Sequence, residues 1–284
     1  MGRYRKLLVA VDGSETSIHA LKESFKLAVN EGSWITVVSV VPPYTGDLDL
    51  TGVRDVMASI RKPCEDALSK AEEAARTEKA LIKTVCEEGE PYEKIVNLAE
   101  TNNCDLIIMG RRGLRRLERA LMGSVTARVI GYTRNDILVI PRDTFVGWQN
   151  ILVATDGSKY SRAAIEKAID FAKSYGGELN ILSVIDVPAE FYAEAPEVAD
   201  DLIRKAKGYV EEARKLAEAS GIKTAIFVRE DVAYEAITAL AKKQKVDTII
   251  LGSHGRTGLK RLLMGSVTEK VIGHAPCPVL VVKP

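Results

Sequence analysis

Two short segments carry side chains and glycines that could hold a charged ligand. Asp12 follows the apolar residues 7–11, and Gly110-Arg111-Arg112-Gly113 follows the apolar residues 106–109, with Gly123-Ser124 after nine intervening residues. Glycines without a Cβ let backbone N–H groups approach an anion closely. A Gly-Ser pair at a helix start adds free N–H groups, a hydroxyl and the positive end of the helix dipole. The spacing therefore predicts a cradle for phosphate.

The carboxylate of Asp12 suits another part of the same ligand. A carboxylate repels phosphate, but it accepts hydrogen bonds from ribose hydroxyls across a shared crevice. Val40, near the end of the second apolar run, is placed to flank an adenine ring and to offer main-chain hydrogen bonds. Asp12 as a helix cap or turn residue, and the glycines as a tight loop needing positive φ, are the alternatives without a ligand.

The same chemistry occurs twice in the chain. Residues 8–14 return as residues 152–158 at an offset of 144, and residues 121–126 return unchanged as residues 263–268 at an offset of 142. This period is far too long for a solenoid and indicates duplication of a whole domain. We predict domains at residues 1–142 and 148–284, joined after Pro141.

Each copy is therefore expected to hold one site at its strand ends and its Gly-Ser helix start. The candidate residues of the first copy are Ala10, Val11, Asp12, Val40, Met109, Gly110, Arg112, Gly113, Gly123, Ser124, Val125 and Thr126. Those of the second copy are Ala154, Thr155, Asp156, Val184, Leu251, Gly252, His254, Gly255, Gly265, Ser266, Val267 and Thr268. His254 is expected to be a loop residue rather than a catalyst, because its counterpart Arg112 cannot act as a base near neutral pH.

The elements that position these residues alternate along each copy. Apolar runs lie at residues 7–11, 35–41, 82–86, 106–109 and 137–140, and again at 151–155, 179–185, 224–228, 248–251 and 279–282. Near-continuous Val, Ile and Leu runs are typical of strands covered on both faces. The segments between them have helical periodicity, with Ser14 and Ser158 as N-caps and Pro91 in a first helical turn.

This alternation predicts an α/β fold. Right-handed crossovers place the strands in a five-stranded, doubly wound parallel sheet of order 3-2-1-4-5, with helices on both faces. Ligands of such sheets bind beyond the carboxyl ends of the strands, where the winding reverses. In this order the first and fourth strands are neighbours, so the Asp and the glycine loop converge on one crevice.

The pattern G-x-x-G-x9-G-S after a strand, with an Asp-Gly-Ser turn near the start, resembles the universal stress protein family. It is most similar to tandem two-domain members of the ATP-binding subgroup. The likeness covers nearly the whole chain, and residues 252–258 and 275–282 are especially close to the common pattern. It implies an adenine nucleotide alpha hydrolase-like sheet, phosphates on the glycine loop, ribose on the Asp, and a stress-response role.

Both copies depart from the family pattern outside the three glycines and the Asp. The first copy reads Thr-Arg-Asn-Asp at 133–136 where the second reads Ala-Pro-Cys-Pro at 275–278, and the second reads Asp-Val-Ala at 231–233 where the first keeps Gly-Glu-Pro. The first loop also holds several arginines: Arg111, Arg112, Arg115, Arg116 and Arg119. Two sites are therefore expected, without equal affinity.

Composition excludes several partners. Forty Lys plus Arg against 39 Asp plus Glu leave a formal charge of +1, so no overall field recruits nucleic acid or an acidic membrane surface. Aromatic residues for base stacking do not interleave with the arginines, and no apolar stretch approaches the roughly 20 residues of a membrane span. Without a signal-type start, a cytoplasmic location is expected. The four cysteines lie far apart and are expected to be reduced thiols without a metal.

The function predicted from these features is regulatory binding of ATP or AMP, with Mg²⁺ optionally bound by the phosphates and with unidentified protein partners. A slow ATP hydrolase or adenylyl-transfer enzyme is the first alternative, although the P-loop G-x-x-x-x-G-K-[ST] and a shared acid–base pair are missing. A scaffold without ligand is the second.

The fifth apolar runs are expected to be edge strands, and an edge strand invites pairing with another strand. Single-domain members of the family commonly dimerise through this strand. We therefore predict that the two halves pair within one chain as a pseudo-dimer, and a homodimer of chains is a further option.

Overall fold

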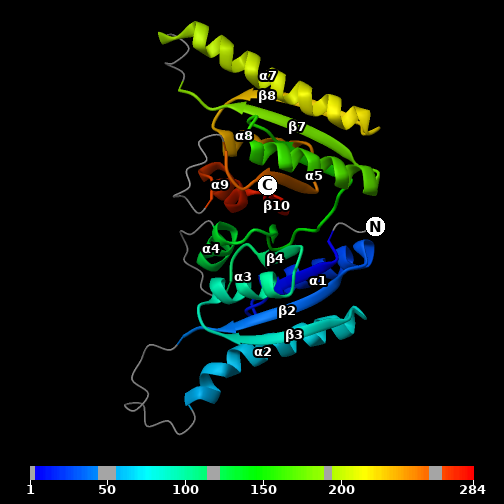
Figure 1. The fold of residues 1–284 in the computed structure, drawn as a ribbon, viewed down its shortest axis with the longest axis vertical. Coiled ribbons are helices and arrows are strands. Elements are labelled where there is room, and N and C mark those ends of the chain that lie inside the picture. The colour runs from blue at the N-terminus through cyan, green and yellow to red at the C-terminus, as the bar shows by residue number, and fades with distance from the viewer. Residues whose placement is uncertain (1–3, 44–55, 114–121, 189–193, 256–263) are drawn as a thin grey trace. The chain divides into compact units, whose positions relative to one another are not determined.

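The computed structural model describes residues 4–43, 56–113, 122–188, 194–255 and 264–284 (Figure 1). The chain divides into two compact units, Met1–Asp143 and Thr144–Pro284. Each unit has its own strands and helices. Arg115, Arg116 and Arg119 of the first glycine loop, and residues 256–258 of the second, lie outside the described residues.

Unit 1 is a parallel sheet whose strands alternate with helices. Its elements are β1 (Lys6–Ala10), α1 (Glu15–Glu31), β2 (Trp34–Val41), α2 (Val56–Thr77), β3 (Ile82–Glu88), α3 (Pro91–Thr101), β4 (Leu106–Gly110), α4 (Ser124–Tyr132) and β5 (Asp136–Ile140). The strand order is β3-β2-β1-β4-β5, with every pair parallel. α1 contacts α2 and α3 contacts α4, which gives one helical layer on each face.

Unit 2 repeats this arrangement. Its elements are β6 (Asn150–Ala154), α5 (Lys159–Tyr175), β7 (Glu178–Ile185), α7 (Pro196–Ala219), β8 (Thr224–Glu230), α8 (Ala233–Lys243), β9 (Thr248–Gly252), α9 (Ser266–His274) and β10 (Val279–Val282). Its order is β8-β7-β6-β9-β10, again parallel. The predicted order 3-2-1-4-5 is confirmed in both units.

Local sequence explains where the helices begin and end. Ser14 and Ser158 cap α1 and α5 by accepting a hydrogen bond from the backbone N–H three residues later. The same helices end at Gly32 and Gly176, which adopt left-handed φ values of 68° and 66°. Pro91 occupies the first turn of α3, where its missing N–H costs nothing.

The strands form the core because both of their faces are covered. All residues of β4, β5, β9 and β10 are buried. The outer strands β3 and β8 are half-buried or exposed along their length, as edges of a sheet are. Among the described residues, no helix has the length and apolarity needed to cross a membrane.

The expectation of four reduced thiols is wrong for one pair. A disulfide joins Cys64 on α2 to Cys86 on β3 and ties this helix to the sheet edge. The other two cysteines are free and buried, and burial raises the pKa of Cys277 to about 12 and raises that of Cys104 as well. The 22-residue separation of the bonded pair gives no sign of a bridge, since only the crossover from α2 to β3 brings the two side chains together.

We expect denatured, unreduced protein to titrate two thiols with a colorimetric thiol reagent, and four after reduction. Closing a loop of this length is worth about 3 kcal/mol in the chain-entropy account, so Cys86→Ser should lower the free energy of unfolding by about that amount. Denaturant unfolding of wild type with and without reductant supplies the control, because reduction should bring wild type to the stability of the variant. Four reactive thiols before reduction would show that the bridge does not form.

Candidate functional site

A pocket of about 430 Å³ lies at the carboxyl end of the unit 2 sheet. It sits where β6 and β9 are neighbours and the winding reverses, since β7 lies beyond β6 on one side and β10 beyond β9 on the other. All the residues proposed for the second copy line it: Ala154, Thr155, Asp156, Val184, Leu251, Gly252, His254, Gly255, Gly265, Ser266, Val267 and Thr268. The fold thus gathers them around one hollow, and their contact with a ligand stays a prediction.

The carboxylate after the first strand faces the glycine loop. Asp156 Oδ1 accepts the N–H of Ser158 at 3.0 Å, which holds the turn into α5. Its other oxygen, Oδ2, lies 2.9 Å from the point where a Cβ on Gly255 would stand. In unit 1, Asp12 Oδ1 accepts the N–H of Ser14 at 3.1 Å, and Oδ2 likewise faces Gly113. Asp12 and Asp156 therefore do hold the turn that was the alternative to ribose binding, in each case through Oδ1.

The Asp-Gly-Ser turn needs its glycine. Gly13 and Gly157 both have φ of 78°, a left-handed conformation that residues with a Cβ rarely adopt. This turn lets the chain leave the strand and enter the helix within three residues. It thereby fixes the direction of the carboxylate at the strand end.

Two hydrogen bonds connect the glycine loop to the helix that follows. In unit 2 the N–H of Gly265 donates to the carbonyl of Ser253 at 2.9 Å, and Thr268 Oγ1 donates to the carbonyl of Gly252 at 2.9 Å. Gly265 is the N-cap of α9 and supplies no side-chain cap, so the first N–H groups of the helix lack that partner at the pocket wall.

Unit 1 has the same two bonds. Gly123 donates to the carbonyl of Arg111 at 3.0 Å, and Thr126 Oγ1 donates to that of Gly110 at 3.2 Å. Gly123 is the N-cap of α4 and also gives no side-chain cap. The remaining first-copy candidates lie at the same strand ends, in the glycine loop or at the helix start: Ala10, Val11, Val40, Met109, Arg112, Ser124 and Val125.

Close packing, rather than a positive φ, explains why glycine occupies the loop positions. None of Gly110, Gly113, Gly252 and Gly255 is among the glycines with φ in the left-handed range. A Cβ on Gly252 would stand 2.6 Å from the carbonyl carbon of Tyr160, and one on Gly110 would stand 3.1 Å from the carbonyl oxygen of Thr16. The first glycine of each loop therefore leaves room for the first helix of its unit, α1 or α5. The second glycine leaves room for the Asp carboxylate.

The sequence did not predict part of the pocket wall. Helices α5, α7 and α8, the end of β7 and the two residues after it contribute Ser161, Ile185, Asp186, Val187, Leu202, Ala206, Ala233 and Ile237. The apolar helix residues have the spacing of ordinary core positions, so periodicity alone could not assign them to a pocket. Asp186 could have been found, because it directly follows a strand in the same way as Asp156, and its Oδ2 accepts the N–H of Ala233 at 2.9 Å.

The two loops differ in charge. Unit 1 has Arg111 and Arg112 where unit 2 has Ser253 and His254. Burial lowers the pKa of Arg111, with a smaller contribution from the charge of Arg112, yet an arginine stays protonated near neutral pH. In unit 2, Ser253 is buried with its Oγ 3.1 Å from His254 Nδ1, and the His254 ring lies 5.2 Å from that of Tyr160. Within the part of the chain that is described, no group of three acidic, His or Cys side chains forms a metal site.

These features define a class of protein: a tandem pair of doubly wound α/β domains, each with an Asp and a glycine loop at the switch point of its sheet. The model of the universal stress protein family matches residues 3–141 and again residues 147–283, and the chain belongs to this family.

Known proteins agree with this assignment. A universal stress protein of Methanocaldococcus jannaschii is 38% identical over 142 residues, which is 48% of this chain and 82% of that protein. One from Mycolicibacterium smegmatis is 25% identical over 98% of this chain and 97% of its own length. The crystal structure of a universal stress protein from Archaeoglobus fulgidus has the same fold, with a TM-score of 0.76 at 24% identity, over 99% of this chain and 97% of that one.

Proposed function

We propose that this protein is a regulator that binds an adenine nucleotide, ATP or AMP, and that unit 2 holds the principal site. The observation that carries the proposal is the pocket of about 430 Å³ between Asp156, the glycine loop and the start of α9. Its volume falls in the range of roughly 300–1,000 Å³ that small-molecule and cofactor pockets occupy.

The chemistry of the walls suits the parts of a nucleotide. The first N–H groups of α9, at Ser266 and Val267, would donate to the phosphates. Oδ2 of Asp156 would accept hydrogen bonds from the ribose hydroxyls. Val184 on one side and the α7 residues Leu202 and Ala206 on another offer apolar surface to the adenine. Mg²⁺, where present, would enter with the phosphates.

Binding without fast turnover is the proposed mode of action. The titratable side chains lining the described pocket are Asp156, Asp186 and His254. Asp156 accepts a backbone N–H within the turn into α5, Asp186 accepts one at the start of α8, and neither lies at a P-loop. We therefore propose that nucleotide occupancy orders the loops around the pocket and that partners respond to that order. The stress-response role and a cytoplasmic location belong to the same proposal.

Incubation with ATP and Mg²⁺, followed by removal of free nucleotide, denaturation and mass spectrometry, tests the proposal. We expect up to two adenine nucleotides per chain, recovered largely as the ATP that was added. The same treatment with GTP is the control for the base. Conversion at the roughly 1–10³ s⁻¹ of typical enzymes would establish the enzyme alternative. Protein that stays empty at millimolar ATP would favour a scaffold.

Pairing of the two halves within the chain is also proposed. β5 and β10 each come last in the strand order of their own unit and are short and wholly buried. Within the chain, the linker raises the effective concentration of the two halves and so favours their pairing. If the halves associate by themselves, separately expressed residues 1–143 and 148–284 should dimerise or recombine, as light scattering would show. Two monomers that ignore each other at high concentration would contradict the pairing, and the mass of the intact chain tests a homodimer.

A further inference from the structure

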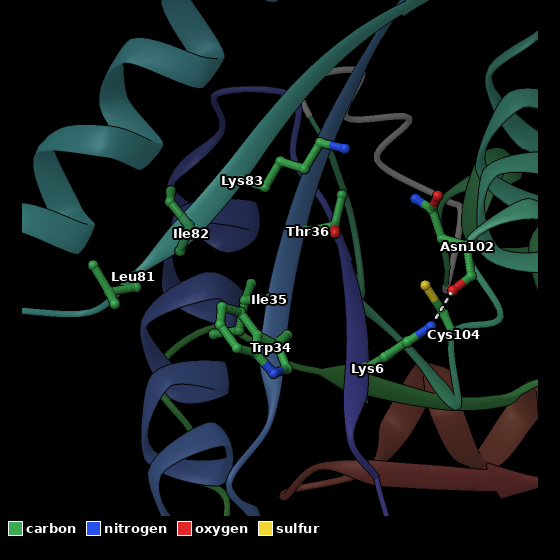
Figure 2. Close-up of a pocket in the computed structure, with 9 residues that line it drawn as sticks. All are labelled: Lys6, Trp34, Ile35, Thr36, Leu81, Ile82, Lys83, Asn102 and Cys104. Carbon is green, nitrogen blue, oxygen red and sulfur yellow. Dashed lines mark hydrogen bonds between the residues drawn. The ribbon is translucent and has the colours of Figure 1, made fainter.

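A second pocket, of about 330 Å³, lies at the opposite, amino-terminal end of the unit 1 strands (Figure 2). Its walls come from the starts of β1, β2 and β3 and from the chain just after α3. The lining residues are Lys6, Trp34, Ile35, Thr36, Leu81, Ile82, Lys83, Asn102 and Cys104. None of them belongs to the candidate nucleotide site.

Strand register brings the polar residues of this pocket to one face of the sheet. Lys6 on β1 is opposite Trp34 on β2, and Thr36 on β2 is opposite Lys83 on β3. Side chains two residues apart on a strand point to the same face, and directly opposite residues are neighbours. Figure 2 shows Thr36 and Lys83 extending toward the side on which Lys6 and Asn102 lie.

This face presents hydrogen-bond donors and positive charge. Among the described residues, the Lys83 ammonium, the Trp34 indole N–H and the Thr36 hydroxyl have no hydrogen-bond or ion-pair partner. Lys6 Nζ donates to the carbonyl of Asn102 at 3.1 Å, its one partner in the described ranges. No ion pair within the described part of the chain joins either ammonium group to a carboxylate, so this part of the face is complementary to an anion.

Neighbouring groups cancel this charge only in part. Asp105 Oδ2 accepts the backbone N–H groups of Arg5 and Lys6 at 2.7 and 2.9 Å and keeps its negative charge beside the pocket, where it offsets part of the charge of Lys6. Burial raises the pKa of the Cys104 thiol, which therefore forms an uncharged wall near neutral pH. Lys6 and Lys83 together outweigh the one carboxylate of Asp105, so the charge that faces a ligand stays positive and is greatest at Lys83.

The same pocket exposes large apolar side chains. Trp34 is 74% exposed and Leu81 is 85% exposed. A tryptophan that keeps most of its surface in water offers a flat apolar platform and one N–H donor, the combination that makes this residue frequent in binding sites. A ligand with an apolar body would bury this surface.

Unit 2 has the corresponding face but closes it. There the position of Trp34 is taken by Glu178, which bonds Lys223 at 2.6 Å, and Lys83 is replaced by Ala225. Asn180 Nδ2 donates to Asn150 Oδ1 at 2.6 Å, and Asn150 Nδ2 donates to the carbonyl of Gln244 at 2.6 Å. The open donors and exposed indole are thus specific to the sequence of unit 1 rather than a requirement of the fold.

We propose that this pocket of unit 1 binds a small organic carboxylate with an aromatic or aliphatic body. The carboxylate would accept hydrogen bonds from the ammonium groups of Lys83 and Lys6, and the body would lie on Trp34 and Leu81. A volume of about 330 Å³ suits a small molecule, being at the lower end of the usual range of ligand pockets.

Titration of the full chain with 3-phenylpropionate tests this site. Binding is measured by calorimetry and by the NMR shifts of the indole N–H resonances. The chain has two tryptophans, and Trp148 is buried in unit 2, so the Trp34 resonance should shift while that of Trp148 stays in place. Lys83→Ala and Trp34→Ala should each weaken binding by about tenfold or more, as expected for loss of a charged hydrogen bond or of an aromatic contact. The uncharged amide, 3-phenylpropionamide, should bind more weakly than the acid by a similar factor.

Lys22→Ala is the matched control, because Lys22 is an exposed lysine on α1 and does not line the pocket. It should leave the affinity unchanged. Unchanged indole resonances at millimolar 3-phenylpropionate, equal affinity for acid and amide, or equal affinity of Lys83→Ala and Lys22→Ala would each overturn the proposal. Lys83→Ala and Trp34→Ala should both retain ATP binding. This result separates loss of the unit 1 pocket from loss of the fold or of the nucleotide site.

Discussion

A chain carrying Gly123→Val and Gly265→Val is expected to lose at least about 100-fold in ATP affinity. Each glycine caps the helix whose first N–H groups face the crevice of its unit. A hydrogen bond to a charged group is worth about 1.5–3 kcal/mol, so loss of two phosphate contacts per site corresponds to about a hundredfold or more.

The available space explains why valine should act at these positions. A Cβ on Gly265 would stand 3.3 Å from His254 Cα, so the rest of a valine side chain must extend into the glycine loop or toward the phosphate position. On Gly123 the nearest atom to such a Cβ is Thr126 Oγ1 at 3.6 Å. Neither backbone has a positive φ, so the helices themselves should still form. The effect is therefore expected on binding more than on folding.

Gly208→Val is the matched control for this double variant. Gly208 lies within α7, and a Cβ there would meet nothing within 4 Å. Calorimetry with ATP should give wild-type affinity for the control and none measurable for the double variant, while circular dichroism shows both folded. Wild-type affinity in the folded double variant would remove the glycine cradle from the proposed site.

The sequence was sufficient for the fold because its local and long-range signals agree. Buried strands such as β4 and β5 are continuous apolar runs, the caps at Ser14 and Ser158 mark helix starts, and the repeat shows each feature twice. Strand ends differ from the expected ones by one or two residues, as where β3 continues to Glu88. Hydrogen bonding along a strand continues past its apolar part, and hydrophobicity alone does not mark that limit.

The predicted site residues came from strand ends and a helix start, which a known topology brings together. What the sequence could not supply is the wall contributed by Leu202 and Ala206, because pocket and core positions on α7 are equally apolar. The sequence likewise could not predict the Cys64–Cys86 bridge or the open pocket around Trp34. Each depends on the packing of a crossover against the sheet edge, and neither follows from any local pattern.

The largest remaining expectation concerns the carboxylates at the strand ends. Asp156→Ala should weaken ATP binding to unit 2 by about 1.5–3 kcal/mol, the cost of losing a hydrogen bond to a charged group. Asp12→Ala should do the same in unit 1. In wild type, 2′-deoxy-ATP should bind more weakly than ATP, since one ribose donor to Oδ2 is missing.

The two roles of Asp156 can be separated because they use different oxygens. Oδ1 holds the turn by accepting the N–H of Ser158, and Oδ2 faces the glycine loop. Asp156→Asn keeps an acceptor for the turn, so it should preserve the melting temperature better than Asp156→Ala while still weakening ATP binding. In Asp156→Ala the preference for ATP over 2′-deoxy-ATP should disappear. A double-mutant cycle that combines wild type and Asp156→Ala with these two nucleotides measures the coupling energy between the carboxylate and the ribose 2′-hydroxyl. If the variant keeps the full sugar preference and loses only thermal stability, the carboxylate serves the turn alone and the ribose must be held elsewhere in the crevice.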